Sequence, residues 1–191
     1  MNIQRSFPPD QARPARFTAQ AYVEARELIN RLFEKTELRD GVIYEMPADG
    51  PLTTKWNNVL LRWLYSSLDD AFIITADKTL RTLEDWGPTP GIYVYSSEHD
   101  EFSVGARNVA LIIDVCDSRL CDDPGEKAEA YAEGGVREYW VIDPKEKRLY
   151  AHHLRKDGTY GAPEQIGFTD SITAQHIPGL TLRMADLPRL S

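Results

Sequence analysis

Apolar residues recur at helical spacing in two stretches of the first third of the chain. The first stretch begins after Thr18 and comprises Tyr22, Ala25, Leu28, Ile29, Leu32 and Phe33. The second follows the loop PADGPLTT and comprises Trp56, Val59, Leu60, Trp63, Leu64 and Leu68. Residues three and four apart share one face of a helix, so each stretch predicts an amphipathic helix.

Other segments change to the pattern of strands. Asp40-Gly41 stands between Glu37-Leu38 and Val42-Ile43-Tyr44, which predicts a β-hairpin with a tight turn. Short β-like runs follow at 72–75, 79–83, 92–95 and 109–113. The last run, Val109-Ala110-Leu111-Ile112-Ile113, is apolar on both faces, as is typical of a central strand that is covered on both sides.

The second half of the chain continues this alternation. An acidic cap, a proline and a glutamate at 122–126 predict the start of a helix, which Gly134-Gly135 ends. Strands are expected at 136–143 and 149–154, and the tail alternates short strands with turns at Asp157-Gly158 and Pro178-Gly179. The order of elements predicts an α/β fold, a mixed central sheet flanked by helices with β-hairpins at both ends.

Length and composition favour one domain. A chain of 191 residues with 42% hydrophobic content is near the usual domain size, so we expect a mobile N-terminal arm at 1–16 and a single domain at 17–191. No apolar stretch approaches the length of a membrane span and the start lacks a hydrophobic signal core, so a cytoplasmic protein without a membrane partner is expected. Cys116 and Cys121 are expected as buried or free thiols.

The net charge of −8 opposes diffuse attraction to a polyanion. It argues against a general nucleic-acid coat protein but leaves room for a local basic groove. The chain also lacks a glycine-rich phosphate loop, a Gly-x-Ser-x-Gly elbow and a His-Glu-x-x-His helix. The aromatic residues Tyr131, Tyr139 and Trp140 stand at core-like spacings and are interpreted as packing residues.

Asp114 is the clearest conflict between a residue and its surroundings. It follows Leu111-Ile112-Ile113 directly, and burying its charge is costly unless a partner compensates it. A Mg²⁺ ion is one such partner, and an ammonium group is another. Lys127, on the following helix, can reach back over the end of the strand to stabilise negative charge. A strand-end aspartate in an ordinary salt bridge or helix cap explains the pattern equally well.

Four segments resemble the Uma-type endonuclease family, a branch of the PD-(D/E)XK restriction-endonuclease-like superfamily. The segments are ELRDGVIYEMP, WGPTPGIYVY, NVALIIDVCDSRLCDDPGEKAEAYAEGGVREYWVIDP and IPGLTLRMADL, of which the third is the most specific. The resemblance implies a restriction-endonuclease-like fold. It also implies that Asp114 is the signature acid and Lys127 the relocated signature lysine. Glu37 and Glu45 match acids of the family's early hairpin, and the implied metal ligands are Asp114 and Glu45.

One position departs from the family pattern. The resemblance leads us to expect Pro-Thr-Pro-Asp before Ile92, whereas the chain reads Pro88-Thr89-Pro90-Gly91, so the first metal-binding acid is missing. Gly91 is either the native residue or an altered one. The nearby acids Glu84, Asp85, Glu98, Asp100 and Glu101 are interpreted as solvated loop residues rather than replacements.

Two functions therefore compete. The resemblance implies a Mg²⁺-dependent endonuclease that hydrolyses DNA phosphodiester bonds. Mn²⁺ can substitute for Mg²⁺ in this hypothesis, and binding is weak or absent if Gly91 is native. The alternative is a catalytically inactive binding or assembly module with the same fold, favoured by Gly91 and the net charge of −8. DNA is the expected partner of the first, and a homodimer is expected in either case.

Overall fold

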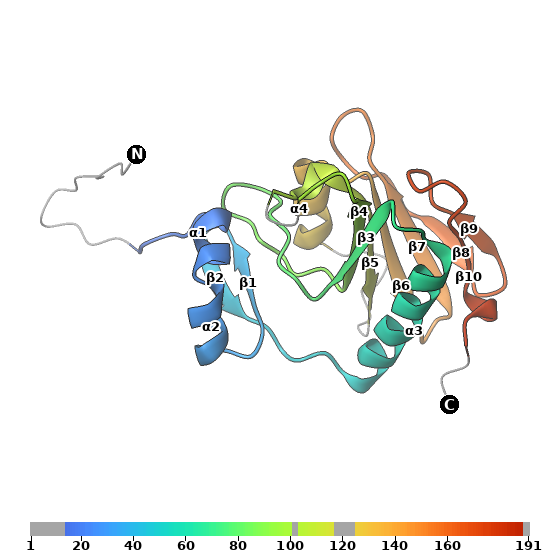
Figure 1. Cartoon of the computed structure of the whole chain (residues 1–191), viewed down its shortest axis with the longest axis horizontal. Coiled ribbons are helices and arrows are strands. Elements are labelled where there is room, and N and C mark those ends of the chain that lie inside the picture. The colour runs from blue at the N-terminus through green and yellow to red at the C-terminus, as the bar shows by residue number, and fades with distance from the viewer. Residues whose placement is uncertain (1–13, 101–102, 117–124, 189–191) are drawn as a thin grey trace, which may run out of the picture.

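The computed structural model describes residues 14–100, 103–116 and 125–188. Most of the expected N-terminal arm at 1–16, and the expected helix start at 122–124, lie outside these residues. Figure 1 shows a central sheet with a helix on either side, a helical and hairpin segment at the N-terminal end, and a second hairpin at the C-terminal end. This arrangement is the α/β fold with a mixed sheet and terminal hairpins that the sequence predicts.

The central sheet has six strands, in the order β3 (Phe72–Ala76), β4 (Ile92–Ser96), β5 (Val109–Val115), β6 (Glu138–Asp143), β7 (Arg148–His153) and β8 (Glu164–Gly167). The β5–β6 pair is parallel and the other pairs are antiparallel. β5 lies inside the sheet, as its continuous apolar run predicts. A parallel pair needs a crossover, and helix α4 (Glu126–Gly134) lies between these strands in the chain.

The two faces of the sheet are covered by different elements. Helix α3 (Pro51–Ser67) and the C-terminal segment pack on one face, where the core includes Leu60, Leu64, Leu111, Ile113 and Trp140. Helix α4 packs on the other face with Tyr131, Tyr139 and the alternate residue of β5, Ile112. Since side chains alternate along a strand, Asp114 projects to the α4 face together with Ile112.

The N-terminal segment forms its own small core. The single helix predicted after Thr18 is wrong in detail. It is divided into α1 (Ala19–Glu24) and α2 (Arg26–Leu32), with Ala25 between them. Thr18 caps α1 by accepting a hydrogen bond from the N–H of Ala21. The predicted hairpin is present as β1 (Thr36–Arg39) and β2 (Val42–Glu45), and Asp40 and Gly41 both have positive φ angles in the turn.

Three other local predictions change. The loop before the second helix is shorter than expected, because α3 begins at Pro51. Proline is favoured in the first turn, since the backbone N–H groups there have no partner within the helix and the one that proline lacks is not missed. The expected strand at 79–83 has only an isolated bridge at Leu83. Cys116 is disulfide-bonded rather than a thiol, and Cys121 lies outside the described residues.

The chain ends in short elements that close the α3 face. β9 (Ser171–Thr173) and β10 (Thr181–Arg183) form an antiparallel hairpin. A 3₁₀ turn, η1 (Ala106–Asn108), precedes β5, and another, η2 (Met184–Asp186), follows β10. Among the described residues, no helix has the length and apolar character required to cross a membrane.

Candidate functional site

Asp114 lies near the end of β5 and accepts hydrogen bonds on both oxygens. The backbone N–H of Gly91 donates to Oδ1 at 2.6 Å, and the hydroxyl of Tyr139 donates to Oδ2 at 3.0 Å. The Asp114 side chain is 15% exposed. This carboxylate is therefore held in one orientation by groups from both neighbouring strands.

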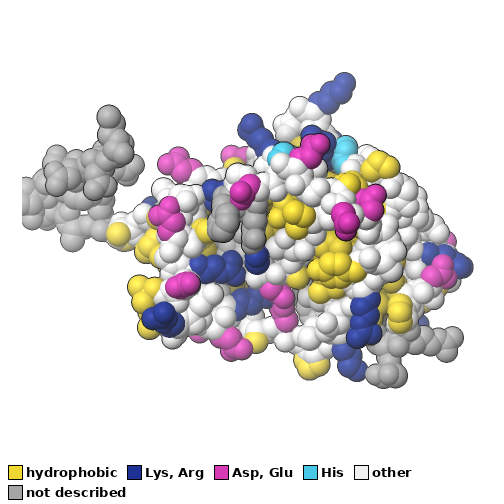
Figure 2. Space-filling model, in the orientation of Figure 1, with side chains coloured by type: hydrophobic (Ala, Val, Ile, Leu, Met, Phe, Trp, Pro, Cys, Tyr) yellow, Lys and Arg dark blue, Asp and Glu magenta, His cyan; other side chains and the backbone are white. Residues whose placement is uncertain are grey.

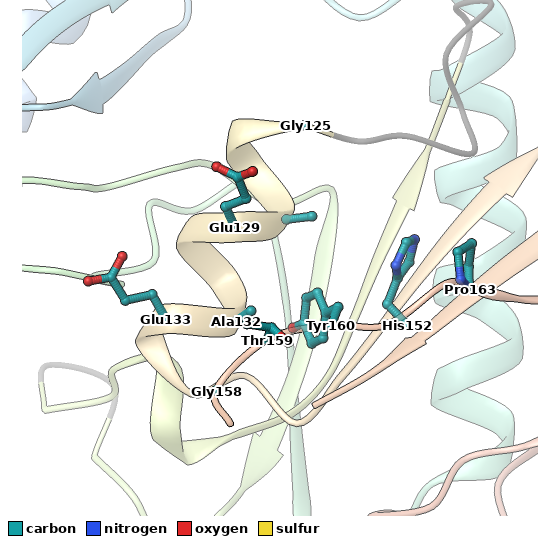
Figure 3. Close-up of a pocket in the computed structure, with 11 residues that line it drawn as sticks. Gly125, Glu129, Ala132, Glu133, His152, Gly158, Thr159, Tyr160 and Pro163 are labelled. Atoms are coloured by element: carbon teal, nitrogen blue, oxygen red, sulfur yellow. The ribbon is translucent and has the colours of Figure 1, made fainter. Parts of the chain in front are cut away.

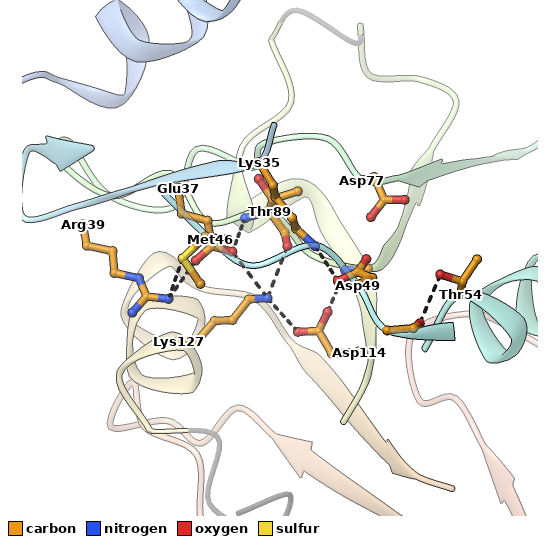
Figure 4. Close-up of polar contacts among 12 residues, drawn as sticks. Lys35, Glu37, Arg39, Met46, Asp49, Thr54, Asp77, Thr89, Asp114 and Lys127 are labelled. Carbon is orange, nitrogen blue, oxygen red and sulfur yellow. Dashed lines mark hydrogen bonds and ion pairs between the residues drawn. The ribbon is translucent and has the colours of Figure 1, made fainter. Parts of the chain in front are cut away.

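Lys127 extends from α4 towards this carboxylate (Figure 4). Its Nζ atom lies 3.2 Å from Oδ2 of Asp114, and it donates a hydrogen bond of 3.2 Å to the carbonyl oxygen of Thr89. The structure thus brings Asp114, Lys127 and Gly91 together around one carboxylate. The lysine is on the same face of the sheet as the acid, as the crossover helix requires.

Glu37, on β1, completes the cluster from the N-terminal hairpin. Oε1 of Glu37 lies 3.8 Å from Nζ of Lys127 and accepts a hydrogen bond of 3.1 Å from the N–H of Thr89. Its Oε2 accepts a hydrogen bond of 2.9 Å from Arg39. Because the Glu37 side chain is only 4% exposed, these two cations compensate a charge that would otherwise be costly to bury.

The electrostatics follow from this arrangement. Burial lowers the pKa of Lys127, but the charges of Asp114 and Glu37 outweigh it, so the pKa of this ammonium group is raised. Burial, followed by the charge of Asp114, raises the pKa of Tyr139 well above its ordinary value. At neutral pH the lysine is therefore charged and the tyrosine is a neutral hydrogen-bond donor.

Gly91 lies where the expected acid is missing, and its surroundings are polar. A Cβ atom built on Gly91 would lie 3.3 Å from Oδ1 of Asp114 and 3.5 Å from Oδ1 of Asn57. Asn57 is a buried residue of α3, and its Oδ1 has no hydrogen-bond partner. Across the ladder, the N–H of Asp77 donates to the carbonyl oxygen of Gly91 at 3.3 Å.

Glu45, the other expected ligand, is placed differently. In the β1–β2 hairpin Glu45 pairs with Thr36, whereas Glu37 pairs with Tyr44. Directly paired residues share a face and successive residues alternate, so Glu45 and Glu37 project to opposite faces of the hairpin. Glu45 is exposed there. The loop acids Glu84, Asp85, Glu98 and Asp100 are also exposed, as expected, and Glu101 lies outside the described residues.

Sequence reasoning missed several polar groups of the cluster. Tyr139 was expected only to pack, yet its ring is buried while its hydroxyl binds Asp114. Asp77 carries a signal that could have identified it, because it directly follows the apolar strand β3 just as Asp114 follows Ile113. Asn57 and Thr89 carry no comparable signal, since their positions depend on how α3 and the 86–91 segment meet the sheet.

The donor set provides a test of whether a divalent ion fits here. Within the described ranges, no three His, Cys, Asp or Glu side chains gather closely enough to hold a metal ion. Asp114 supplies a carboxylate, and the unpartnered Oδ1 of Asn57 supplies a neutral oxygen beside it. Mg²⁺ in proteins is commonly held by one or two carboxylates with waters completing its shell. The residues therefore fit a weakly held, largely hydrated ion.

A cavity of about 230 Å³ adjoins the cluster on the side of the N-terminal segment. Its lining includes Thr89, whose backbone binds both Lys127 and Glu37, and also Asp77, Asp49, Lys35 and Arg26. Lys35 and Asp49 form an ion pair of 2.6 Å at this cavity. Figure 4 shows Asp49 and Asp77 on the same side of the cluster. The cluster is therefore next to a polar hollow that carries both signs of charge.

A larger cavity, of about 570 Å³, lies between α4 and the β7–β8 connection. Figure 3 shows Glu129 and Glu133 on α4 at one side of it, with Tyr160 and His152 at the other. His152 stacks on Tyr139, the residue that binds Asp114, with ring centroids 5.6 Å apart. This second cavity is thus next to the cluster through the buried aromatic residues and through α4, which carries both Lys127 and part of the cavity lining.

The surface charge is mixed rather than uniformly basic. In the view of Figure 2, Lys and Arg side chains are interspersed with Asp and Glu, and hydrophobic side chains gather over the middle of this face. This distribution agrees with the net charge of −8 in excluding a broad basic surface from this face.

Comparisons with known proteins identify the family and the fold. Residues 23–185 match the model of the Uma2 family, which is described as "Putative restriction endonuclease". The fold is similar to that of a crystal structure described as a "putative nuclease belonging to DUF820" from Anabaena variabilis, with a TM-score of 0.64 and 14% identity over 79% of this chain and 88% of that chain.

A second solved structure, the type IIG restriction endonuclease BpuSI, has a TM-score of 0.38 and 10% identity over 56% of this chain and 12% of that chain, too low to support a conclusion. No curated protein matches the chain. The family match covers most of the sequence and includes both Asp114 and Lys127. The chain therefore belongs to the Uma2 family.

Proposed function

We propose that this protein is a divalent-metal-dependent endonuclease that hydrolyses DNA phosphodiester bonds, with an activity that Gly91 strongly reduces. The observation that supports the proposal best is the position of Lys127, whose Nζ lies 3.2 Å from Asp114 at the end of β5. Family membership supports the nuclease class. Mg²⁺ is the proposed ion, with Mn²⁺ as a substitute, and Asp114 is the proposed ligand.

The chain's own groups would have distinct roles. Asp114 is held in place by the Gly91 N–H and the Tyr139 hydroxyl, so its orientation is fixed before an ion binds. Lys127 places a positive charge beside it, where it would stabilise the charge that develops on a phosphate. Glu37 forms ion pairs with Lys127 and Arg39 and so helps to position the lysine. A bound ion would supply Lewis acidity and a water of lowered pKa.

Cleavage of plasmid DNA with Mg²⁺ or Mn²⁺ tests the proposal. We expect little cleavage by the wild-type chain and an increase of about 10²-fold in Gly91→Asp, the scale of one electrostatic catalytic group. Gly91→Asp combined with Asp114→Ala should return to the wild-type level. Gly105→Asp is a matched control. Gly105 has an ordinary φ of −128°, and the one atom within 4 Å of an added Cβ is the backbone carbonyl oxygen of Arg81, at 3.6 Å.

A non-catalytic binding or assembly module is the second candidate. The observation that favours it is that both oxygens of Asp114 already have protein partners, Lys127 and Tyr139 on Oδ2 and the N–H of Gly91 on Oδ1. In this case Gly91→Asp gains no cleavage, and Asp114→Ala affects only stability. Equal cleavage by all the variants would indicate a contaminating nuclease and would contradict the proposal.

A homodimer is part of either proposal. Large apolar side chains are exposed on the N-terminal segment: Leu28 62%, Leu32 68%, Phe33 40%, Val42 39% and Tyr44 48%. Exposed apolar patches commonly mark interaction sites. Light scattering after size exclusion should give about twice the chain mass of 21.7 kDa. A charged residue in place of Leu32 should reduce the measured mass to that of one chain.

A further inference from the structure

Asn57 is a buried polar residue whose amide oxygen has no partner. The residue is 8% exposed, and no hydrogen bond reaches its Oδ1. Leaving a buried acceptor without a hydrogen bond is destabilising. Its neighbour Asn58, by contrast, is exposed, and its Nδ2 donates to the carbonyl oxygen of Thr54 at 2.9 Å. Such an unpaired group in a well-packed helix requires an explanation.

The oxygen of Asn57 is directed at the position of the missing side chain. From an ideal Cβ position on Gly91, Oδ1 of Asn57 lies at 3.5 Å, Oδ1 of Asp114 at 3.3 Å and the carbonyl oxygen of Ile113 at 3.2 Å. All three atoms are oxygens and hence hydrogen-bond acceptors. Oxygens from α3 and β5 thus converge beside a residue that has no side chain, and a cation would relieve their mutual repulsion.

Asp77 approaches the same residue from the other neighbouring strand. In the sheet, Ala76 of β3 pairs with Ile92 of β4, which pairs in turn with Ile113 of β5. One residue further along the three strands in the same direction, Asp77, Gly91 and Asp114 stand side by side in the same order. The hydrogen bond of 3.3 Å from Asp77 N–H to Gly91 O continues this ladder. Gly91 is therefore flanked by one aspartate on each adjacent strand, and Asp77 also lines the 230 Å³ cavity.

We propose that Asn57 and Asp77 supply the oxygen ligands that Gly91 lacks, so that a divalent cation is held by Asp114, Asn57 and Asp77. This inference rests on the proposed function, because it names the ligands of the same site. The two oxygens of Asp114 have separate roles in it. Oδ2 binds Lys127 and Tyr139, while Oδ1 accepts one hydrogen bond, from the N–H of Gly91, and lies beside the Gly91 Cβ position that Oδ1 of Asn57 also approaches.

A competing explanation for Asn57 is purely structural. With its amide turned over, Asn57 would present Nδ2, a hydrogen-bond donor, to the acceptor oxygens around the Gly91 Cβ position. The two arrangements respond in opposite ways to an acid at this position. If Asn57 is a cation ligand, aspartate at this position strengthens the site. If Asn57 is a hydrogen-bond donor, aspartate replaces that donor with a second negative charge near Asp114.

The test is a titration of the purified chain with Mn²⁺ alone. Binding is measured by calorimetry and by the shift in the midpoint temperature of thermal unfolding. We expect Asn57→Asp to bind Mn²⁺ at least about tenfold more tightly than the wild type. It should have a lower midpoint without the ion and a larger ion-induced gain. Asn58→Asp adds the same charge one residue away on the exposed face, and its affinity should stay within twofold of the wild type.

Two further variants remove ligand oxygens. Asn57→Leu keeps the approximate volume and should weaken Mn²⁺ binding by about tenfold or more, as should Asp77→Asn. The matched control for the second is Asp70→Asn, at an exposed position next to β3, which should leave the affinity unchanged. Circular dichroism of each variant confirms that it is folded before titration.

The outcomes separate this inference from the proposed function. If Gly91→Asp gains cleavage but Asn57→Asp, Asn57→Leu and Asp77→Asn leave Mn²⁺ affinity unchanged, the nuclease assignment stands and the ligand assignment is overturned. If Asn57→Asp binds Mn²⁺ tightly while Gly91→Asp does not cleave DNA, the ligand assignment stands and the proposed function fails. A loss of stability in Asn57→Asp without a gain in affinity supports the turned-over amide and contradicts the inference.

Discussion

The hydroxyl group of Tyr139 donates a hydrogen bond of 3.0 Å to Oδ2 of Asp114 from the neighbouring parallel strand. This contact joins a residue of the α4-side core to the proposed metal ligand. The same oxygen faces Lys127, so an O–H group and an ammonium group share one acceptor.

Tyr139→Phe removes this donor while leaving the ring in place. A hydrogen bond to a charged group is worth about 1.5–3 kcal/mol, so we expect the free energy of unfolding in urea to fall by that amount. The matched control is Tyr160→Phe, because the Tyr160 hydroxyl donates at 2.8 Å to the neutral carbonyl of Val136. Its loss should be smaller, about 0.5–1.5 kcal/mol. Equal losses would mean that the charge on Asp114 does not strengthen its bond.

Lys127→Met leaves two acids of the cluster without their shared cation. Removing one partner of a buried pair costs about 3–5 kcal/mol, and we expect about 2–3 kcal/mol because the Lys127 side chain is 25% exposed. Adding Glu37→Gln should recover part of the loss in urea unfolding, since one uncompensated charge disappears. A double variant less stable than Lys127→Met would show that Glu37 does not depend on the lysine for its charge compensation.

Alkaline pH should weaken the cluster through the same lysine. The pKa of Lys127 in the folded chain is raised above its ordinary value of 10.5. The lysine therefore contributes its full stability below pH 10.5 and loses it as the pH rises through the higher folded value. The difference in unfolding free energy between wild type and Lys127→Met should be constant from pH 7 to pH 9 and should shrink above about pH 10.5. A difference that is unchanged at pH 11.5 would contradict a charged lysine in the cluster.

Much of the fold could be predicted from local pattern. Leu111-Ile112-Ile113 gave the central strand, and Asp40-Gly41 gave the hairpin turn, because both signals are contained in adjacent residues. The interruption of the first helix at Ala25 could not be predicted from local pattern, since the helical spacing of apolar residues continues through it. Tyr22 and Ile29 are buried whereas Leu28 and Leu32 are exposed, and only the packing against β1 decides this.

The candidate site was predictable only where the chain itself brings residues together. Asp114 and Lys127 belong to one strand–crossover–strand unit, so their proximity follows from the order of elements. Glu45 was expected near the metal, but hairpin alternation directs it away from Glu37. Asn57 and Asp77 come from α3 and β3, and their approach to Gly91 depends on long-range pairing that no local pattern encodes.

The parallel pairing of β5 with β6 has a consequence for folding. Antiparallel neighbours can pair through a tight turn, whereas a parallel pair needs a crossover connection, and here α4 packs against the sheet between the two strands in the chain. That docking is also what delivers Lys127 to Asp114 and lines up Tyr139 beside it. A chain in which α4 has not docked would therefore expose the Asp114 carboxylate without its compensating cation.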